Sequence, residues 1–312
     1  MKIVFMGTPE FAVPTLRQLL MYHEVVAVYT QPDRPAGRGN KLQISPIKAL
    51  ALDAGIDVIQ PVNFKQKEVR ESLACLNADV FIVAAYGIIL PKSVLDMPRL
   101  GCINVHASLL PKYRGASPIH AVIKNGETTT GITIMYMDVG IDTGDMIYKQ
   151  ELTIYPKERV GSLHDRLAEL GGECIIEALM QLEAGTAARI PQDDADSSYA
   201  PMIQKSDGLI DWSCSTQQII NLIRAFDPWP GSYTIYEDQF MKIWHLSETE
   251  NQPKEDILPG TILAADQAQG ILVQTGSGVA CILEIQASGS KRMTAKDYLR
   301  GREIKVGAIL NR

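Results

Sequence analysis

The first half of the chain alternates short apolar runs with longer segments in which apolar positions recur at helical spacing. Apolar residues at 12, 13, 16, 19 and 20 fall on one face of a helix, whereas the short runs are typical of buried strands. The strands are predicted at 3–6, 25–29, 58–60, 80–85 and 103–105, and further helices near 46–54 and 67–77. Strands that alternate with helices indicate a mostly parallel sheet covered on both faces.

The segment after the first strand predicts how the first helix begins. Thr8 can cap the helix and Pro9 suits its first position, because proline needs no backbone donor there. Gly7 is the only glycine of a G-x-G-x-x-G pattern here, so we do not expect a dinucleotide site. A tight strand-to-helix turn that could also hold an anion is the remaining interpretation.

The pattern changes twice further along the chain. Segments 132–137 and 146–152 predict a strand pair, and a helix from about 160 to 182 follows it. Residues 184–205 lose periodicity and gain small and acidic residues, as linkers do. Beyond them, a helix at 216–225 precedes short strands typical of a small β-barrel or sandwich. These strands are expected at 232–236, 240–246, 260–265, 270–275 and 279–287. We therefore expect a first domain at 1–183, a linker at 184–205 and a second domain at 206–312.

Composition narrows the class of protein. The 312 residues are 46% hydrophobic and 6% aromatic, and the net charge of −6 gives no global signal for nucleic acid. Five scattered cysteines without a CxxC pair indicate reduced thiols, and five dispersed histidines show no metal-ligand spacing. We expect no signal peptide, no membrane-spanning segment and a cytoplasmic monomer.

Three polar residues form the strongest candidate site. Asn104 and His106 are two apart at the end of a predicted strand, so they point to the same side of the sheet. The ends of parallel strands are where ligands bind. An amide and an imidazole there can polarise a carbonyl and move a proton, and Asp142, carried by the connection between the strand pair, could orient the imidazole. A structural histidine is the alternative for His106 taken alone.

Three further segments carry possible binding residues. The connection 31–44 is long and holds Arg34, Arg38 and Lys41; it is a solvated loop or an arm for a phosphate backbone. Residues 86–91 follow a strand, and Gly87 permits close backbone approach to a planar heterocycle, although core packing is the alternative. The tail 291–312 has seven basic and two acidic residues, net +5, which is a solvated face or a nucleic-acid contact.

Together these segments closely resemble the bacterial methionyl-tRNA formyltransferase family. The matching motifs are Phe5-Met-Gly-Thr-Pro-Glu-Phe-Ala12, Gln31-Pro-Asp-Arg-Pro-Ala-Gly-Arg-Gly39, Asn104-Val-His-Ala-Ser-Leu-Leu-Pro-Lys-Tyr-Arg-Gly-Ala116, Asp138-Val-Gly-Ile-Asp-Thr-Gly-Asp145, Phe226-Asp-Pro-Trp-Pro-Gly231 and Gly289-Ser-Lys-Arg-Met293. The Asn-x-His…Asp set with Ser-Leu-Leu-Pro is shared by folate-dependent formyltransferases. The first motif, the Arg-rich loop and the tail narrow the resemblance to the tRNA enzymes.

The resemblance implies a fold and a reaction. It implies an α/β Rossmann-like N-terminal domain joined to an OB-like C-terminal β-barrel that binds tRNA. The implied reaction moves a formyl group from 10-formyltetrahydrofolate to the α-amine of methionyl initiator tRNA and releases tetrahydrofolate, without a metal. Asn104 and His106 would donate to the oxyanion and Asp142 would hold His106 and help to shuttle the proton.

The resemblance also assigns binding residues. Folate would lie against Ser108, Leu109, Leu110 and Pro111, and its pterin against the backbone of Tyr86, Gly87, Ile88 and Leu90. The expected tRNA contacts are Arg34, Arg38, Lys41, Lys291 and Arg292.

Three other functions compete with this one. A formyltransferase for a sugar nucleotide or another small amine shares the catalytic set, and only the Arg-rich loop, the barrel and the tail argue against it. A nucleotide-dependent oxidoreductase lacks its glycine motif. A non-catalytic RNA-binding module leaves the coexistence of Asn104, His106 and Asp142 unexplained.

Overall fold

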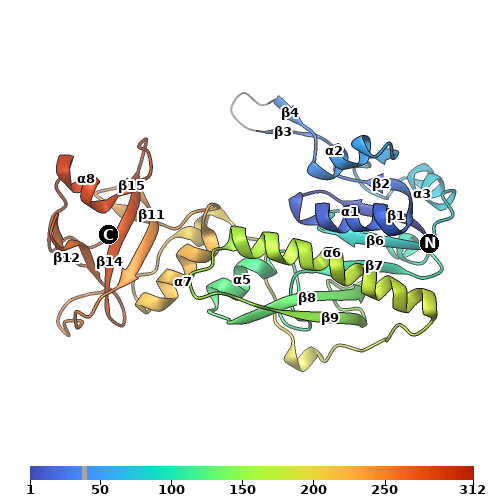
Figure 1. The fold of residues 1–312 in the computed structure, drawn as a ribbon. Coiled ribbons are helices and arrows are strands. Elements are labelled where there is room, and N and C mark those ends of the chain that lie inside the picture. The colour runs from blue at the N-terminus through green and yellow to red at the C-terminus, as the bar shows by residue number, and fades with distance from the viewer. Residues whose placement is uncertain (37–40) are drawn as a thin grey trace. The chain divides into compact units, whose positions relative to one another are not determined.

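The chain folds into two compact units, each described here by itself (Figure 1). The computed structural model describes residues 1–36 and 41–312. Unit 1 comprises Met1–Pro118, Thr129–Thr153 and Leu163–Ala200. Unit 2 comprises Ile119–Thr128, Ile154–Ser162 and Pro201–Arg312.

Unit 1 is built on a seven-stranded sheet of order β5-β2-β1-β6-β7-β8-β9. The first five strands of this order pair in parallel, and β7, β8 and β9 pair antiparallel. The predicted mostly parallel sheet and the predicted strand pair are therefore confirmed. The strands are β1 (Lys2–Gly7), β2 (Glu24–Tyr29), β5 (Val58–Ile59), β6 (Val80–Ala84), β7 (Cys102–His106), β8 (Thr129–Tyr136) and β9 (Met146–Thr153).

Helices cover both faces of this sheet because its strands are apolar on both sides. Val4 and Met6 pack with Leu73 of α3 and Val94 of α4 in one buried cluster. The opposite face carries α1 and α6, which lie side by side in Figure 1; Gly172 of α6 is close enough to α1 that an added Cβ would lie 3.1 Å from the backbone of Pro14. The helices are α1 (Val13–Tyr22), α2 (Pro46–Asp53), α3 (Lys67–Ala74), α4 (Lys92–Leu95) and α6 (Val160–Ala184).

The turn after β1 differs from the predicted capping arrangement. A short 3-10 helix (η1, Glu10–Ala12) follows Pro9, and α1 begins only at Val13. Thr8 does not cap either helix, because its hydroxyl donates to the carbonyl of Tyr86 at 3.1 Å. The prediction of Thr8 as a cap was wrong; the hydroxyl instead ties the β1 turn to the segment after β6.

The long connection after β2 contains a small hairpin that the sequence pattern did not predict. Its strands are β3 (Arg34–Ala36) and β4 (Lys41–Gln43), paired antiparallel. Lys48 anchors the base of the hairpin through an ion pair with Asp33 at 2.6 Å. The predicted tRNA contact Arg38 lies outside the described residues.

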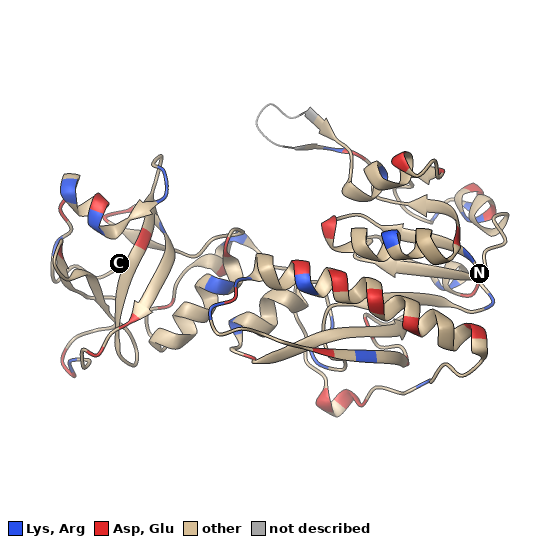
Figure 2. Ribbon diagram, in the orientation of Figure 1, with Lys and Arg blue, Asp and Glu red and all other residues tan. Residues whose placement is uncertain are grey.

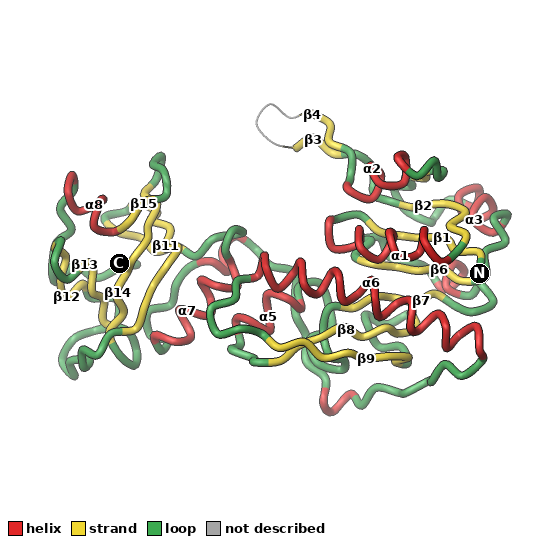
Figure 3. The backbone as a smooth tube through the Cα atoms, viewed as in Figure 1, coloured by secondary structure: helices red, strands yellow, loops and turns green. Residues whose placement is uncertain are grey.

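Unit 2 is an antiparallel sheet with helices, as the turn-separated strands predicted. The strand order is β10-β11-β14-β13-β12, with β15 paired to β14, and Figure 3 separates these strands from the helices by colour. Helix α7 begins with a capping box in which Ser215 and Gln218 satisfy each other's backbone donors. The elements of this part are α5 (Pro118–Lys124), α7 (Thr216–Phe226), β10 (Tyr233–Tyr236), β11 (Gln239–Glu248), β12 (Ile262–Asp266), β13 (Gly270–Gln274), β14 (Val279–Ala287), β15 (Met293–Thr294), α8 (Ala295–Gly301) and the 3-10 helix η3 (Lys205–Gly208).

Replacing Gly131 with alanine is expected to destabilise unit 1. Gly131 lies in β8, where an added Cβ would come within 2.1 Å of the Gln150 carbonyl oxygen and 2.6 Å of the Leu109 side chain. Relieving this overlap should cost about 1–3 kcal/mol of unfolding free energy, measured by urea denaturation followed by circular dichroism. Gly161→Ala in α6 is the control, because nothing lies within 4 Å of its added Cβ. An unchanged Gly131→Ala curve would contradict the proposed crowding.

Candidate active site

The C-terminal end of β7 presents the predicted polar pair. Asn104 pairs in register with Val83 of β6 and with Met135 of β8, so the neighbouring strands fix its position. His106 lies at the end of the strand and is only 5% exposed. Alternation along the strand places both side chains on the same face of the sheet, as predicted.

Asp142 completes this cluster from the loop between β8 and β9. Its carboxylate accepts a hydrogen bond from the backbone amide of Gly115 at 2.8 Å. The same carboxylate lies 3.6 Å from His106 Nδ1 and 3.4 Å from Asn104 Nδ2. Asp142 itself has a left-handed backbone, with φ of 53°, which is uncommon for a residue other than glycine. The structure therefore brings Asn104, His106 and Asp142 together.

The second ring nitrogen of His106 reveals how the ring is held. Nε2 lies 2.9 Å from the carbonyl oxygen of Tyr113. A carbonyl oxygen only accepts, so Nε2 carries a hydrogen and neutral His106 turns the lone pair of Nδ1 toward Asp142. An added proton on Nδ1 would be shared with that carboxylate. His106 Nδ1 and the Asp142 carboxylate thus face each other at 3.6 Å.

The Ser108–Pro111 segment is held by β8 and by its own turn. Thr133 Oγ1 donates to the Ser108 carbonyl at 2.7 Å and accepts from the Leu110 amide at 3.1 Å. The Ser108 hydroxyl donates to the Lys112 carbonyl at 2.7 Å. Ser108 and Leu110 are buried, whereas Leu109 and Pro111 are partly exposed. Leu109 and Pro111 are therefore the members of this segment that a ligand can reach.

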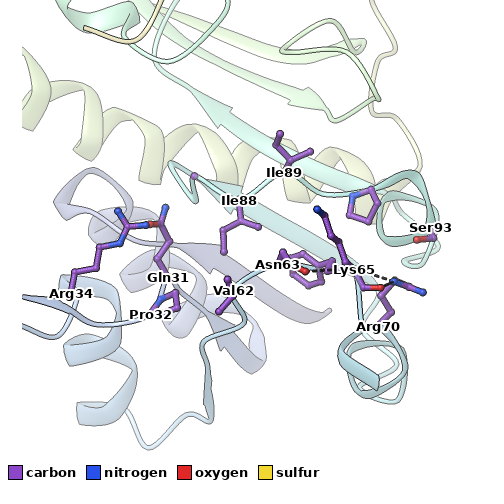
Figure 4. Close-up of a pocket in the computed structure, with 13 residues that line it drawn as sticks. Gln31, Pro32, Arg34, Val62, Asn63, Lys65, Arg70, Ile88, Ile89 and Ser93 are labelled. Atoms are coloured by element: carbon purple, nitrogen blue, oxygen red, sulfur yellow. Dashed lines mark hydrogen bonds between the residues drawn. The ribbon is translucent and has the colours of Figure 1, made fainter. Parts of the chain in front are cut away.

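A cavity of about 650 Å³ adjoins the segment after β6 (Figure 4). Gly87, Ile88 and Ile89 line it, while Tyr86 and Leu90 are buried in the core. The Tyr86 carbonyl already accepts a hydrogen bond from Gln31 at 2.9 Å. Of the predicted pterin-binding residues, Gly87 and Ile88 are thus accessible. Ile89, which we had not singled out from the sequence, is 91% exposed.

Basic side chains lie at the two opposite ends of this cavity in Figure 4. Arg34, which we had predicted as a tRNA contact, lines the cavity together with Lys65 and Arg70. Arg70 is fixed by hydrogen bonds from its guanidinium to the carbonyls of Phe64 and Lys65, both at 2.7 Å. The cavity therefore combines an apolar wall with cationic groups.

A smaller cavity of about 310 Å³ lies along the same face of β7 as the polar cluster. Cys102, two residues before Asn104, lines it with Leu95, Met137 and Val139. Burial, and secondarily the nearby charge of Asp96, raises the pKa of the Cys102 thiol to about 12. Cys102 is therefore a neutral apolar wall at physiological pH and not a nucleophile.

The predicted basic contacts of the C-terminal region differ in their surroundings. Lys291 is exposed. The Arg292 guanidinium donates to Glu284 and also lies 3.4 Å from Asp227. Figure 2 shows blue and red residues interspersed over the ribbon of this unit, so part of its positive charge is compensated within the chain.

Four groups of the site carried no signal in the sequence pattern. They are the carbonyl of Tyr113, the amide of Gly115, the hydroxyl of Thr133 and the side chain of Gln192. Gln192 lies in the stretch 184–205, where we had expected a linker, and unit 1 extends to Ala200. Backbone groups are present in every residue and so cannot be singled out from the sequence. Gln192 is distant in sequence from the loop that it contacts.

Within residues 1–36 and 41–312, no group of three or more His, Cys, Asp and Glu side chains is placed to hold a metal ion. In the same residues, no helix combines the length and apolarity needed to cross a membrane.

Comparison with known proteins identifies the family. The formyl transferase family profile matches residues 1–179, and that of the formyl transferase C-terminal domain matches residues 202–303. The chain belongs to the formyl transferase family. Among formyl transferase relatives, the methionyl-tRNA formyltransferase of Ruminiclostridium cellulolyticum is 50% identical, with all of both chains aligned. That of Clostridioides difficile is 48% identical over 99% of this chain and 100% of its own.

Solved structures share the formyl transferase fold. The N-formyltransferase of Helicobacter canadensis, in complex with folinic acid and dTDP-3-aminofucose, aligns with a TM-score of 0.65 at 19% identity, over 94% of this chain and 100% of its own. HypX of Aquifex aeolicus in complex with tetrahydrofolic acid aligns with a TM-score of 0.60 at 17% identity, over 96% of this chain. This chain spans 47% of the length of HypX. At these identities the likeness establishes the fold alone.

Replacing Thr133 with valine tests how the Ser108–Pro111 segment is supported. Valine has nearly the same shape but leaves the buried Leu110 amide without an acceptor and the Ser108 carbonyl without this donor. The unfolding free energy should fall by about 1–3 kcal/mol, as measured by chemical denaturation. Thr133→Ser keeps the hydroxyl and should lose much less. Equal losses in the two variants would contradict a role for the hydroxyl.

Proposed function

We propose that this chain transfers the formyl group of 10-formyltetrahydrofolate to the α-amine of methionyl initiator tRNA. The geometry that carries the proposal is the meeting of Asn104, His106 and Asp142 at the end of β7, with Asp142 between the amide and the imidazole. About 50% identity to relatives named methionyl-tRNA formyltransferase, aligned over their full length, supports this acceptor over a small amine.

The proposed reaction uses each of the three residues. The neutral amine attacks the formyl carbon and forms a tetrahedral oxyanion, which the Asn104 amide stabilises; one well-placed donor contributes about 3–4 kcal/mol. The nitrogen of the attacking amine loses a proton as the formamide product forms. The bond from carbon to folate N10 breaks, and N10 leaves with a proton. The His106–Asp142 pair takes the first proton and supplies the second, directly or through water.

The position of His106 refines the role expected from the sequence. Its Nε2 hydrogen is already donated to Tyr113, and its Nδ1 faces Asp142. Donation from the imidazole to the oxyanion would require leaving one of these partners. We therefore assign His106 chiefly to proton transfer and Asn104 to oxyanion stabilisation.

The two cavities provide space for the folate. We propose that the pterin occupies the face of β7 lined by Cys102 and Val139, with Gly87 and Ile88 at its edge, and that Leu109 and Pro111 flank the formyl-bearing part.

The acceptor tRNA would contact residues of both units. We propose that Arg34, Arg38 and Lys41 contact the acceptor end, that unit 2 is an OB-like barrel, and that its exposed Lys291 contacts the backbone. Phosphate contacts of this kind make binding depend strongly on salt. Residues 184–205 would lead from a catalytic domain at 1–183, with which the residues up to Ala200 are packed, to a tRNA-binding domain at 206–312. A cytoplasmic monomer fits this role.

Single-turnover formylation tests the proposed reaction. With enzyme in excess over methionyl initiator tRNA and 10-formyltetrahydrofolate present, we expect formyl-methionyl-tRNA to form, as followed by acid gel electrophoresis. A dTDP-amino sugar should be formylated far more slowly. Faster transfer to the sugar would move the assignment to a sugar-nucleotide formyltransferase.

Alanine substitution tests the catalytic cluster. His106→Ala and Asp142→Ala should each reduce the single-turnover rate by about 100-fold or more, the scale of positioned acid–base groups. Asp165→Ala removes a carboxylate from the exposed side of α6 and should leave the rate unchanged. Wild-type turnover by either site variant would refute the assignment.

Arg38→Ala tests the proposed contact with the acceptor end. Loss of a phosphate contact should raise the KM for tRNA by about 10-fold at low salt and leave folate affinity unchanged. Lys67→Ala is the matched control, since Lys67 is an exposed cation of α3 that is paired with Glu71. Unchanged tRNA kinetics in Arg38→Ala would exclude the contact.

A further inference from the structure

The side chain of Gln192 holds the backbone of the Asp142 turn. Its Nε2 lies 2.8 Å from the carbonyl oxygen of Asp142 and 2.8 Å from that of Gly144. An amide nitrogen has two hydrogens, and each carbonyl takes one of them. Gln192 therefore joins two points of the turn that carries the catalytic carboxylate.

The other end of the same amide is also engaged. Gln192 Oε1 accepts a hydrogen bond from Arg114 Nε at 2.9 Å. Arg114 lies between Tyr113, whose carbonyl holds His106, and Gly115, whose amide holds the Asp142 carboxylate. One side-chain amide thus connects both loops that position the His106–Asp142 pair.

The orientation of the amide is determined by its partners. If the amide were flipped, its oxygen would face two carbonyl oxygens at 2.8 Å and its nitrogen would face the Arg114 guanidinium. Both contacts would be repulsive, because acceptors would meet acceptors and donors would meet a donor. Glutamine is therefore required here by hydrogen-bond polarity, and glutamate of the same shape would not satisfy the two carbonyls.

The segment around Gln192 is itself tied to unit 1 by backbone hydrogen bonds. Ile190 exchanges two of them with Met146 at the start of β9. Arg114 and Ala200 are joined by a 2.7 Å hydrogen bond, and the Arg114 amide donates to Ser198 at 2.9 Å. The backbone of the segment that carries Gln192 is therefore fixed to unit 1.

From these contacts, we infer that Gln192 is a positioning residue of the formyl transfer reaction, acting through Asp142. The inference rests on the proposed function of the Asn104, His106 and Asp142 cluster. The left-handed backbone of Asp142 is held where its carboxylate meets His106, and the Gln192 side chain donates directly to the carbonyl of that backbone. Releasing the turn would let the carboxylate move away from the imidazole.

Gln192→Glu is the sharpest variant for testing this role. It keeps the shape and the acceptor for Arg114, and it replaces the two donated hydrogens with a carboxylate oxygen. We expect kcat to fall by about 10- to 100-fold, the effect of a displacement of about 1 Å in a catalytic group. The KM values for tRNA and folate should change little. Asp194→Asn is the control from the same segment; it weakens the ion pair with Arg114 and should leave kcat unchanged.

A double-mutant cycle separates positioning from general structural support. If Gln192 acts through the carboxylate, Gln192→Glu should have no further effect on kcat in an Asp142→Ala background, because the group that it positions is absent. The same loss in both backgrounds, or wild-type kcat in Gln192→Glu alone, would overturn the inference. Wild-type kcat in Asp142→Ala alone would instead refute the proposed catalytic cluster.

Discussion

The proposed active site depends on holding one carboxylate beside one buried imidazole. The Asp142 carboxylate is bound by the Gly115 amide at 2.8 Å and faces His106 at 3.6 Å. His106 is bound on its other nitrogen by the Tyr113 carbonyl. Because the same short loop supplies both the carbonyl and the amide, any movement of that loop changes both members of the pair. The rest of unit 1 serves to keep the loop and the Asp142 turn in register.

The surrounding sheet explains why this register can be kept. β7 lies between β6, which it meets in parallel, and β8, which it meets antiparallel. The change of direction lets β8 run back from the site and return the chain through the Asp142 turn to β9. Gly144 permits the close approach at this return, since an added Cβ would clash with the Tyr136 carbonyl. A backbone hydrogen bond from the Tyr136 amide to the Asp145 carbonyl at 2.9 Å closes the base of the turn, and Gln192 holds two carbonyls within it.

The sequence pattern predicted the strands of the seven-stranded sheet and the meeting of the three polar residues of the cluster, because these leave regular or chemically distinctive signals. Alternation along a strand is sufficient to place Asn104 and His106 on one side. The sequence pattern could not predict the partner of Thr8. Its hydroxyl donates to the distant carbonyl of Tyr86 and does not cap a helix, because this tertiary contact overrides the local preference. It could not predict Gln192 either. A glutamine in an irregular acidic stretch looks like a linker until the fold places its amide between two carbonyls.

The basic C-terminal region shows why counting charge is not enough to assign contacts. Arg300 and Lys305 pair with Asp297 and Glu237 while their side chains remain at least 70% exposed. Such surface ion pairs contribute little to stability, so their basic side chains can exchange a carboxylate partner for a phosphate at a small free-energy cost. Arg292 differs, since its partner Asp227 is only 12% exposed, and withdrawing the guanidinium would leave a largely buried carboxylate with less compensation. A phosphate backbone would therefore recruit Lys291 more readily than its neighbour Arg292, although the two are adjacent and carry the same charge.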